Sequence, residues 1–381
     1  MHFNLTPGQA AFQQAARRFA RERVAPQAAA LDERDEFPTD LVKEAGALGF
    51  MGATIPKEWG GAGADYVSYA LALEEIARAS ATLAVILVVN NSLVVEPLLR
   101  FGSDVQKQRW LRALATGERV GAFALSEEDA GTDAANQQTQ ASELPGGGFR
   151  LSGRKTWVTC AEVADVVIVF SGEGSTEGKR AVSAFLLPMK TRGIARGPRD
   201  QSMGVRGLGA IDVELRDVDV EADAMLGERG QGFEVARWAF EGARIAIAAQ
   251  AIGIGAVAFD EAREHAKKRQ TFGKPIATYE AIQFMLADSA TELDAARMLT
   301  LKAAAAKDER EQCGTEAAMA KLYASEAAAR ATDRAMQILA SAGYRRGSTL
   351  ERLYRDVRAA EIYPGTSEVQ RMIISGALLR K

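Results

Sequence analysis

Hydrophobic residues recur at helical spacing in the first part of the chain and again in the last part. In the first part the pattern runs through Phe12, Phe19 and Val24, through 41–48 and through 66–76. In the last part it occupies alanine-rich segments at 232–267, 278–307 and 314–342, and a final segment from Ser367. A period of three to four residues is typical of amphipathic helices. Both ends of the chain are therefore predicted to be helical.

The middle of the chain has a different pattern. Between about Gly121 and Leu226, short β-branched runs alternate with glycine, proline and aspartate turns, as at 165–170, 181–188 and 211–215. Such runs predict short strands. We therefore expect an N-terminal helical domain at 1–121, a middle β domain at 122–226 and a C-terminal helical domain at 227–381. This order describes a multi-domain α+β protein.

Composition excludes several classes of partner. The 381 residues are 25% charged and 47% hydrophobic, with a formal net charge of −3, which is ordinary for a globular protein. No long basic block is present, which argues against nucleic acid. The longest apolar run, Leu83 to Val89, is too short to cross a bilayer. Without an apolar signal core, the N-terminus predicts a cytoplasmic protein of bacterial type, or a mature matrix protein that lacks its presequence.

The numbers and positions of the histidines, cysteines and glycines argue against disulfides, metal sites and nucleotide-binding loops. Two cysteines and two histidines give neither a disulfide framework nor the spacing of a metal site. No strand–glycine-loop–helix fingerprint or phosphate-binding loop is present. Gly253 and Gly255 lie inside a helical pattern, where close helix packing is the better interpretation. Ordinary dinucleotide-binding dehydrogenases and nucleotide hydrolases are therefore poor interpretations.

Short motifs stand in order along almost the whole chain. They are PKEWGG at 56–61, EEI at 74–76, NNSL at 90–93, ALSE at 124–127, GTD at 131–133, GRKTWVT at 153–159, LGE at 226–228, RQTFG at 269–273, FMLAD at 284–288, QIL at 337–339 and EIYPGTSE at 361–368. Together they resemble the acyl-CoA dehydrogenase family, nearest its short-chain, butyryl-type members. The resemblance implies that family's fold, with a β-sandwich or barrel in the middle and a four-helix-bundle-like C-terminal domain. It also implies FAD as cofactor, an acyl-CoA substrate, an electron-transfer flavoprotein as acceptor, and a homotetramer or homodimer.

The resemblance assigns residues to the two ligands. For FAD it implies Leu125 and Ser126 at the pyrimidine edge, Trp157 on the ring, Thr159 at N5, and Arg269, Thr271, Phe272, Gln337, Thr366 and Glu368 toward the dinucleotide. The arginine motif usually serves a neighbouring subunit. For the acyl-CoA it implies Asn91, Thr132, Phe233, Arg244, Tyr363 and Gly365. A guanidinium suits a phosphate because its charge is permanent and its donors are forked. No residue is expected to bind a metal.

The chain departs from the family where the proton should be removed. The family usually has a glutamate between the tyrosine and the Gly-Thr-Ser, and that glutamate is the base that takes the substrate α-proton. Here the position is Pro364, which supplies neither a carboxylate nor a backbone N–H. Isovaleryl-type relatives place the base just before the family arginine, and that position is Ala243. Both family locations of the base are therefore empty.

Three acids are candidates for a surrogate base: Glu96, Glu128 and Asp129. Each could instead be an ordinary solvated charge. The leading hypothesis is oxidation of an acyl-CoA to an enoyl-CoA with a relocated base, for a cyclic or branched acyl group. The alternatives are enoyl-CoA reduction or γ-elimination on the same scaffold, and an acyl-CoA-binding homologue without catalysis.

Overall fold

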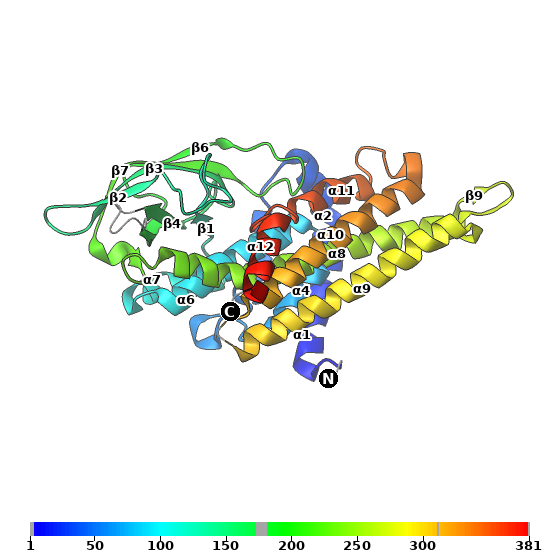
Figure 1. The fold of residues 1–381 in the computed structure, drawn as a ribbon, viewed down its shortest axis with the longest axis horizontal. Helices are drawn as coiled ribbons and strands as arrows, with labels where there is room; N and C mark the ends of the chain where they lie inside the picture. The colour runs from blue at the N-terminus through cyan, green and yellow to red at the C-terminus, as the bar shows by residue number, and fades with distance from the viewer. Residues whose placement is uncertain (1–3, 173–180, 311, 380–381) are drawn as a thin grey trace.

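The computed structural model describes residues 4–172, 181–310 and 312–379. Two sets of helices pack together, and a β-sheet covers one end of them (Figure 1). The predicted order of helices, strands and helices is confirmed. The largest hydrophobic core contains residues from both helical parts, and smaller cores lie under and within the sheet. The cavity described below lies where the sheet meets the helices.

The N-terminal helices begin at residues whose side chains satisfy free backbone N–H groups. Thr6 and Ser103 each form a capping box, and Asp65 and Ser80 accept from N–H groups three residues ahead. The α-helices are α1 (Pro7–Phe19), α2 (Ala25–Arg34), α3 (Thr39–Ala47), α4 (Tyr66–Ala77), α5 (Ala81–Val88), α6 (Glu96–Phe101) and α7 (Asp104–Ala115). Two π-helical segments, η1 (Ala20–Val24) and η4 (Val89–Val95), continue the helices on either side of them, and η2 (Phe50–Gly52) and η3 (Lys57–Trp59) are short 3-10 helices.

In the part of the middle domain that the structure describes, the strands form one mixed sheet of eight. They are β1 (Gly121–Ala124), β2 (Gln140–Glu143), β3 (Phe149–Val158), β4 (Val166–Gly172), β5 (Val182–Pro188), β6 (Ile194–Arg199), β7 (Ile211–Val220) and β8 (Met225–Leu226), with the turn η5 (Ala222–Ala224) before β8. The order is β6-β7-β3-β2-β4-β5-β8, and β1 pairs with β4 in parallel. The central strands β4 and β5 are buried along nearly their whole length, which explains their continuous apolar sequence.

The C-terminal part consists of long helices. Its elements are α8 (Gly232–Lys268), β9 (Gln270–Thr271), β10 (Lys274–Pro275), η6 (Ile276–Thr278), α9 (Glu280–Glu309), α10 (Gly314–Leu339), η7 (Ala340–Ala342), α11 (Thr349–Ala359) and α12 (Ser367–Leu379). Helix α8 runs through the centre of the molecule. A Cβ at Gly253 would lie 2.5 Å from the Glu74 carbonyl oxygen, and one at Gly255 would lie 3.1 Å from the Ala328 Cα. These glycines therefore allow close helix packing, as the sequence predicted.

Two helical stretches are apolar and long enough to cross a membrane, if length and composition alone are considered. They are Ala81–Phe101 and Gly232–Lys268, and 89% of the most apolar window of each is buried inside the protein. Core helices of globular proteins share this property, so the protein interior accounts for their hydrophobicity.

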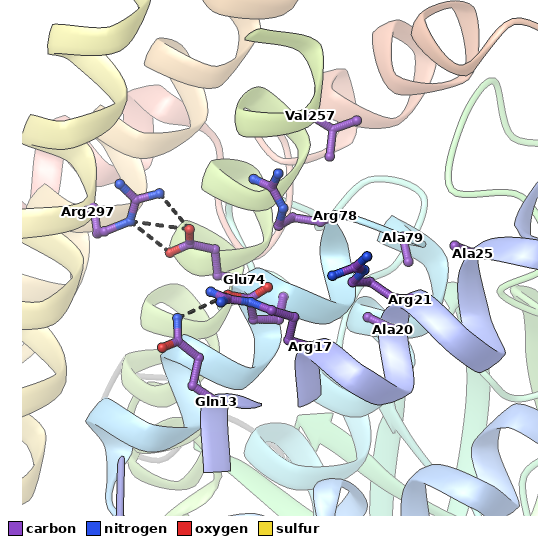
Figure 2. Close-up of a pocket in the computed structure, with 11 residues that line it drawn as sticks. Gln13, Arg17, Ala20, Arg21, Ala25, Glu74, Arg78, Ala79, Val257 and Arg297 are labelled. Atoms are coloured by element: carbon purple, nitrogen blue, oxygen red, sulfur yellow. Dashed lines mark hydrogen bonds and ion pairs between the residues drawn. The ribbon is translucent and has the colours of Figure 1, made fainter. Parts of the chain in front are cut away.

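A polar pocket of about 650 Å³ lies between α1, α4, α8 and α9 (Figure 2). The carboxylates of Glu74 and Glu75 lie at its base and are almost fully buried. Arg297 of α9 binds Glu74 with a shortest distance of 2.6 Å, and Arg17 of α1 binds Glu75 at 2.6 Å. Both acids already have a guanidinium partner, so neither carboxylate in this pocket is free. The ion pair between Arg297 and Glu74 joins the C-terminal helices to the N-terminal helices.

The ion pair between Arg297 and Glu74 gives a stability prediction. Arg297→Met should lower the free energy of unfolding by roughly 2–4 kcal/mol, because a buried carboxylate loses its cation. Arg21 lines the same pocket without a hydrogen bond or ion pair among the described residues. Arg21→Met is therefore the control, and it should change the free energy of unfolding by less than about 0.5 kcal/mol. Denaturant unfolding of both variants tests this, and equal losses would contradict it.

Candidate active site

A cavity of about 1070 Å³ lies between the β-sheet, α8 and the loop that joins α11 to α12. Its exposed lining is mostly apolar. The apolar wall comes from the helical stretch α5–η4 and from α8, and consists of Val85, Val88, Val89, Leu93, Phe240, Ala243 and Ile247. The opposite wall is more polar and comes from the β domain and the loop at 199–210. A site with one apolar and one polar wall suits a ligand that has both kinds of surface.

The polar wall includes a loop that a buried ion pair anchors. Lys155 of β3 is fully buried, and its ammonium donates to the Leu125 carbonyl at 3.0 Å and to the Glu127 carboxylate at 2.7 Å. Burial opposes ionisation of Glu127, but hydrogen bonds from Lys155 and Thr139 hold its pKa below the ordinary value. The Thr156 N–H donates to the Ser126 carbonyl at 3.0 Å. Leu125 and Ser126 are therefore held against the cavity.

Trp157 projects from an irregularity in β3. The register between β3 and β7 shifts between Lys155 and Val158, as expected for a bulge that re-aims a side chain. Trp157 has a φ of 54°, which is strained for a residue with a side chain, and is 59% exposed where it lines the cavity. An exposed indole held this way offers its face to a flat ligand. Thr159, two residues later, lines the same cavity.

The loop before α12 forms another edge of the cavity, with Tyr363, Pro364, Gly365 and Thr366 in the lining. Two fully buried side chains hold this loop from behind. Lys321 of α10 donates to the Gly365 carbonyl at 2.8 Å, and Gln370 of α12 donates to the same oxygen at 2.8 Å. The position of Pro364 is therefore fixed by a lysine and a glutamine that do not reach the cavity.

Lys321 should make stability depend on pH. Burial lowers its pKa from 10.5 to about 8, so between these values the unfolded chain binds more protons than the folded chain. The free energy of unfolding contributed by Lys321 therefore rises as pH rises from about 8 to about 10.5. In denaturant titrations, the difference between wild type and Lys321→Met should grow across this range. Lys302→Met, at an exposed site on α9, is the control, and a constant difference for Lys321→Met would contradict the assignment.

Arg244 of α8 is the most unusual charge in the lining. It is 7% exposed, and its Nε has no hydrogen-bond partner. Burial lowers its pKa to about 10, although the Glu241 carboxylate opposes this. Asp200 also lines the cavity, has one buried carboxylate oxygen without a partner, and has a pKa raised by burial. Unpaired buried polar atoms in a cavity wall indicate that a polar ligand completes them.

The structure brings many of the residues implied by the resemblance into this one cavity. The lining includes Leu125, Ser126, Glu128, Thr132, Trp157, Thr159, Ala243, Arg244, Tyr363, Pro364, Gly365 and Thr366. It does not include Asn91, Glu96, Asp129, Phe233, Gln337 or Glu368. Phe233 packs against the core beneath the sheet, and hydrogen bonding from the Thr366 side chain lowers the pKa of the exposed Glu368.

Glu96 lies behind α8 as seen from the cavity. Its carboxylate accepts from the hydroxyls of Thr54 and Tyr66, and from the Asn91 amide at 3.0 Å. A Cβ at Gly242 would lie 3.1 Å from the Glu96 carboxylate, whereas the next residue, Ala243, lines the cavity. Burial raises the pKa of Glu96. Asn91 therefore serves this internal network.

Arg269, Thr271 and Phe272 lie on or beside the β9–β10 hairpin. In Figure 1 the hairpin is at the tip of α9, at the opposite end of the molecule from the β-sheet. Phe272 is 92% exposed and has a φ of 52°. These residues cannot reach the cavity of their own chain.

The sequence analysis missed Lys321 and Gln370. A signal for Lys321 was available, since it stands among buried alanines of α10 such as Ala317, Ala320 and Ala324. A lone lysine on the apolar face of a helix indicates a buried cation. The described residues contain no group of three or more His, Cys, Asp or Glu side chains placed to hold a metal ion.

The residues present fit a flavin. The strained, exposed indole of Trp157 offers a flat apolar face, and Asp200 has a buried carboxylate oxygen without a hydrogen-bond partner in the same cavity wall. When bound, FAD would lie against Leu125, Ser126, Trp157 and Thr159. The apolar wall remains available for a second ligand.

Comparison with known proteins agrees with this site. The chain matches the acyl-CoA dehydrogenase N-terminal, middle and C-terminal domains over residues 6–118, 122–218 and 230–379. It is 44% identical over 367 residues to the mitochondrial short-chain specific acyl-CoA dehydrogenase of Bos taurus, covering 96% of this chain and 89% of that protein.

Two solved structures extend the comparison over the full chain. The butyryl-CoA dehydrogenase of Megasphaera elsdenii has a TM-score of 0.96 at 39% identity, with both chains covered completely. A chain from a structure titled for the electron transferring flavoprotein of Acidaminococcus fermentans has a TM-score of 0.96 at 37% identity, also with complete coverage. By these matches the chain belongs to the acyl-CoA dehydrogenase family of FAD-dependent oxidoreductases, which act on CH–CH donors.

Proposed function

We propose that this protein oxidises an acyl-CoA thioester to its enoyl-CoA, using a base at neither of the two family positions. The observation that carries the proposal is the composition of one cavity. Its lining combines Ser126, Trp157 and Thr159, which suit the flavin, with an apolar wall and with Pro364 and Ala243 at the two base positions. The surfaces for cofactor and acyl chain are present, and only the proton acceptor has moved.

FAD, when bound, supplies the acceptor for the hydride that leaves the substrate β-carbon. The chain's own residues set the geometry around it. Trp157 and Thr159 place the ring, and the wall formed by Val88, Val89 and Ile247 holds the acyl chain and excludes water. Lys321 and Gln370 fix the loop at the thioester.

Glu128 is the acid that we propose as the base. Of the three surrogate candidates it alone lines the cavity, since Glu96 lies behind α8 and Asp129 is exposed outside the lining. A carboxylate is able to take the α-proton if it reaches hydrogen-bond distance in the substrate complex. Glu128 follows directly after Glu127, which Lys155 anchors, so its backbone position is set.

The assembly and acceptor belong to the same proposal. We propose a homotetramer or homodimer in which the β9–β10 hairpin of one copy reaches the FAD of another, because this hairpin cannot reach its own cavity (Figure 1). An electron-transfer flavoprotein is the proposed acceptor, in keeping with the Acidaminococcus fermentans match. We further propose a cytoplasmic protein that is not inserted into a membrane, because both apolar helical stretches are mostly buried in the fold.

Anaerobic titration of the purified flavoprotein with saturated linear, branched and cyclic acyl-CoAs tests the function. Bleaching of the flavin absorption by one class would support dehydrogenation and identify that class. A flavin that no saturated ester bleaches, but that an enoyl-CoA perturbs, would favour reduction or elimination. Tight binding without turnover with any acceptor would favour the catalytically silent homologue.

A further inference from the structure

The loop at 199–210, which belongs to the polar wall of the cavity, contains a strained turn. Val205 has a φ of 47°, in the left-handed region that a β-branched residue rarely adopts. Met203, Gly204 and Val205 all line the cavity, and we call them the 203–205 turn. A strained backbone conformation persists only where the surrounding contacts hold it. The contacts of this turn therefore set the shape of this part of the wall.

Helix α11 holds each residue of the 203–205 turn by a separate contact. Asp356 is 3% exposed, and its carboxylate accepts from the Val205 N–H at 2.6 Å. The Arg355 guanidinium donates to the Met203 carbonyl at 3.1 Å. A Cβ at Gly204 would lie 2.3 Å from the Arg355 carbonyl oxygen, so the two backbones pack directly against each other. These contacts clamp the turn to a helix that is distant in the sequence.

The helical domains fix this clamp in turn. Arg355 pairs with Asp32 of α2 and with Glu351 of its own helix, each at 2.6 Å. The Asp35 carboxylate, at the end of α2, accepts from the Gly207 N–H at 2.6 Å. Helix α11 also leads into the loop before α12, which is another edge of the cavity. One helix therefore holds both that edge and part of the polar wall.

From these contacts we propose that Asp356 is a positioning residue for FAD: through the Val205 N–H it holds the wall against which the flavin would lie. The 203–205 turn lines the same cavity as Ser126 and Trp157, which suit the flavin. Asp356 itself does not line the cavity, so it acts through the turn and not by contact with the cofactor. A ligand site is precise only when the residues behind it are locked in place. The proposal concerns retention of the cofactor, so it does not depend on which residue is the base.

Release of FAD from the loaded protein after dilution, followed by the fluorescence of the released flavin, tests the proposal. Asp356→Ala should release FAD about tenfold or more faster than wild type, as expected when a hydrogen bond to a charged group is lost. Asp356→Asn keeps an acceptor oxygen for the Val205 N–H and should stay within about threefold of wild type. Burial raises the pKa of Asp356 to about 6, so the ionised form is held at a cost and a neutral acceptor should lose little.

Leu350→Ala is the control for a general loss of stability. Leu350 is buried toward the N-terminal end of α11, where a Cβ at Gly343 would lie 2.9 Å from its side chain. This variant should unfold at lower denaturant concentration but release FAD within about threefold of wild type. Hydrogen exchange locates the effect. In Asp356→Ala, exchange should rise at 200–210 and stay at the wild-type level in β4 and β5.

Gly204→Ala tests the clamp from the opposite side and leaves Asp356 intact, which keeps the test decisive if Asp356→Ala does not fold. Its added Cβ would push the turn away from α11 and should also speed FAD release. Three results would overturn the proposal: release from Asp356→Ala no faster than from Leu350→Ala, release from Gly204→Ala at the wild-type rate, or faster exchange along the whole Asp356→Ala chain. None of these measurements uses flavin bleaching by an acyl-CoA, so the proposed dehydrogenase function is tested separately.

Discussion

Replacing Pro364 with glutamate should raise the rate of flavin reduction by a saturated linear acyl-CoA such as butyryl-CoA by about 10²–10⁴-fold. The variant returns a carboxylate to the cavity edge and an N–H to the backbone. Arg244 and Lys321 lie near this position and would keep the new carboxylate ionised. Stopped-flow measurement of flavin bleaching under anaerobic conditions gives the rate directly.

Two further variants separate the contributions of the carboxylate and the N–H. Pro364→Ala restores only the N–H, which is worth about 2.7–4 kcal/mol as an oxyanion donor in comparable sites. Pro364→Gln adds a neutral side chain of glutamate's size. A glutamate variant no faster than the glutamine variant would show that residue 364 does not reach the α-proton in this chain.

Glu128→Gln should lower the rate of flavin reduction by the best substrate about 10²–10⁴-fold, as expected when a positioned general base becomes an amide. The change keeps size and hydrogen-bonding capacity, and Glu128 takes no part in the buried pair that anchors the loop. The visible spectrum should therefore show FAD still bound, with the loss confined to the chemical step. Single-turnover bleaching rates check this.

Asp129→Asn is the matched control for Glu128→Gln. Asp129 is the next residue, carries the same charge and is exposed outside the cavity lining, so its variant should keep the wild-type rate within about threefold. Equal losses in the two variants would indicate an effect of the loop rather than of a base. No loss in either would remove Glu128 as the base and leave proton removal to the substrate's own groups or to water.

Local sequence patterns predicted much of the fold. The helical period predicted segments that match α8, α9, α10 and α12 closely, and α9 and α10 each bury a regular stripe of mostly small and apolar residues. The strand signals at 165–170 and 181–188 match β4 and β5, which are continuously apolar because they are buried. Helix α11 was not predicted separately, since its short sequence is rich in charge and its boundaries depend on the Ser348 cap.

For the candidate site too, some features follow from the sequence and others only from the tertiary structure. The sequence by itself determined that Pro364 and Ala243 stand at the two positions where the resemblance to the family predicts a base, because the identity of a residue needs no structure. Only the tertiary structure decided that Glu96 lies behind α8, that Lys321 and Gln370 hold Gly365, and that Arg244 has no partner among the described residues. Periodicity states which face of a helix is buried. It does not state which side chain from a distant segment meets that face, and the charge balance of a cavity depends on those long-range contacts.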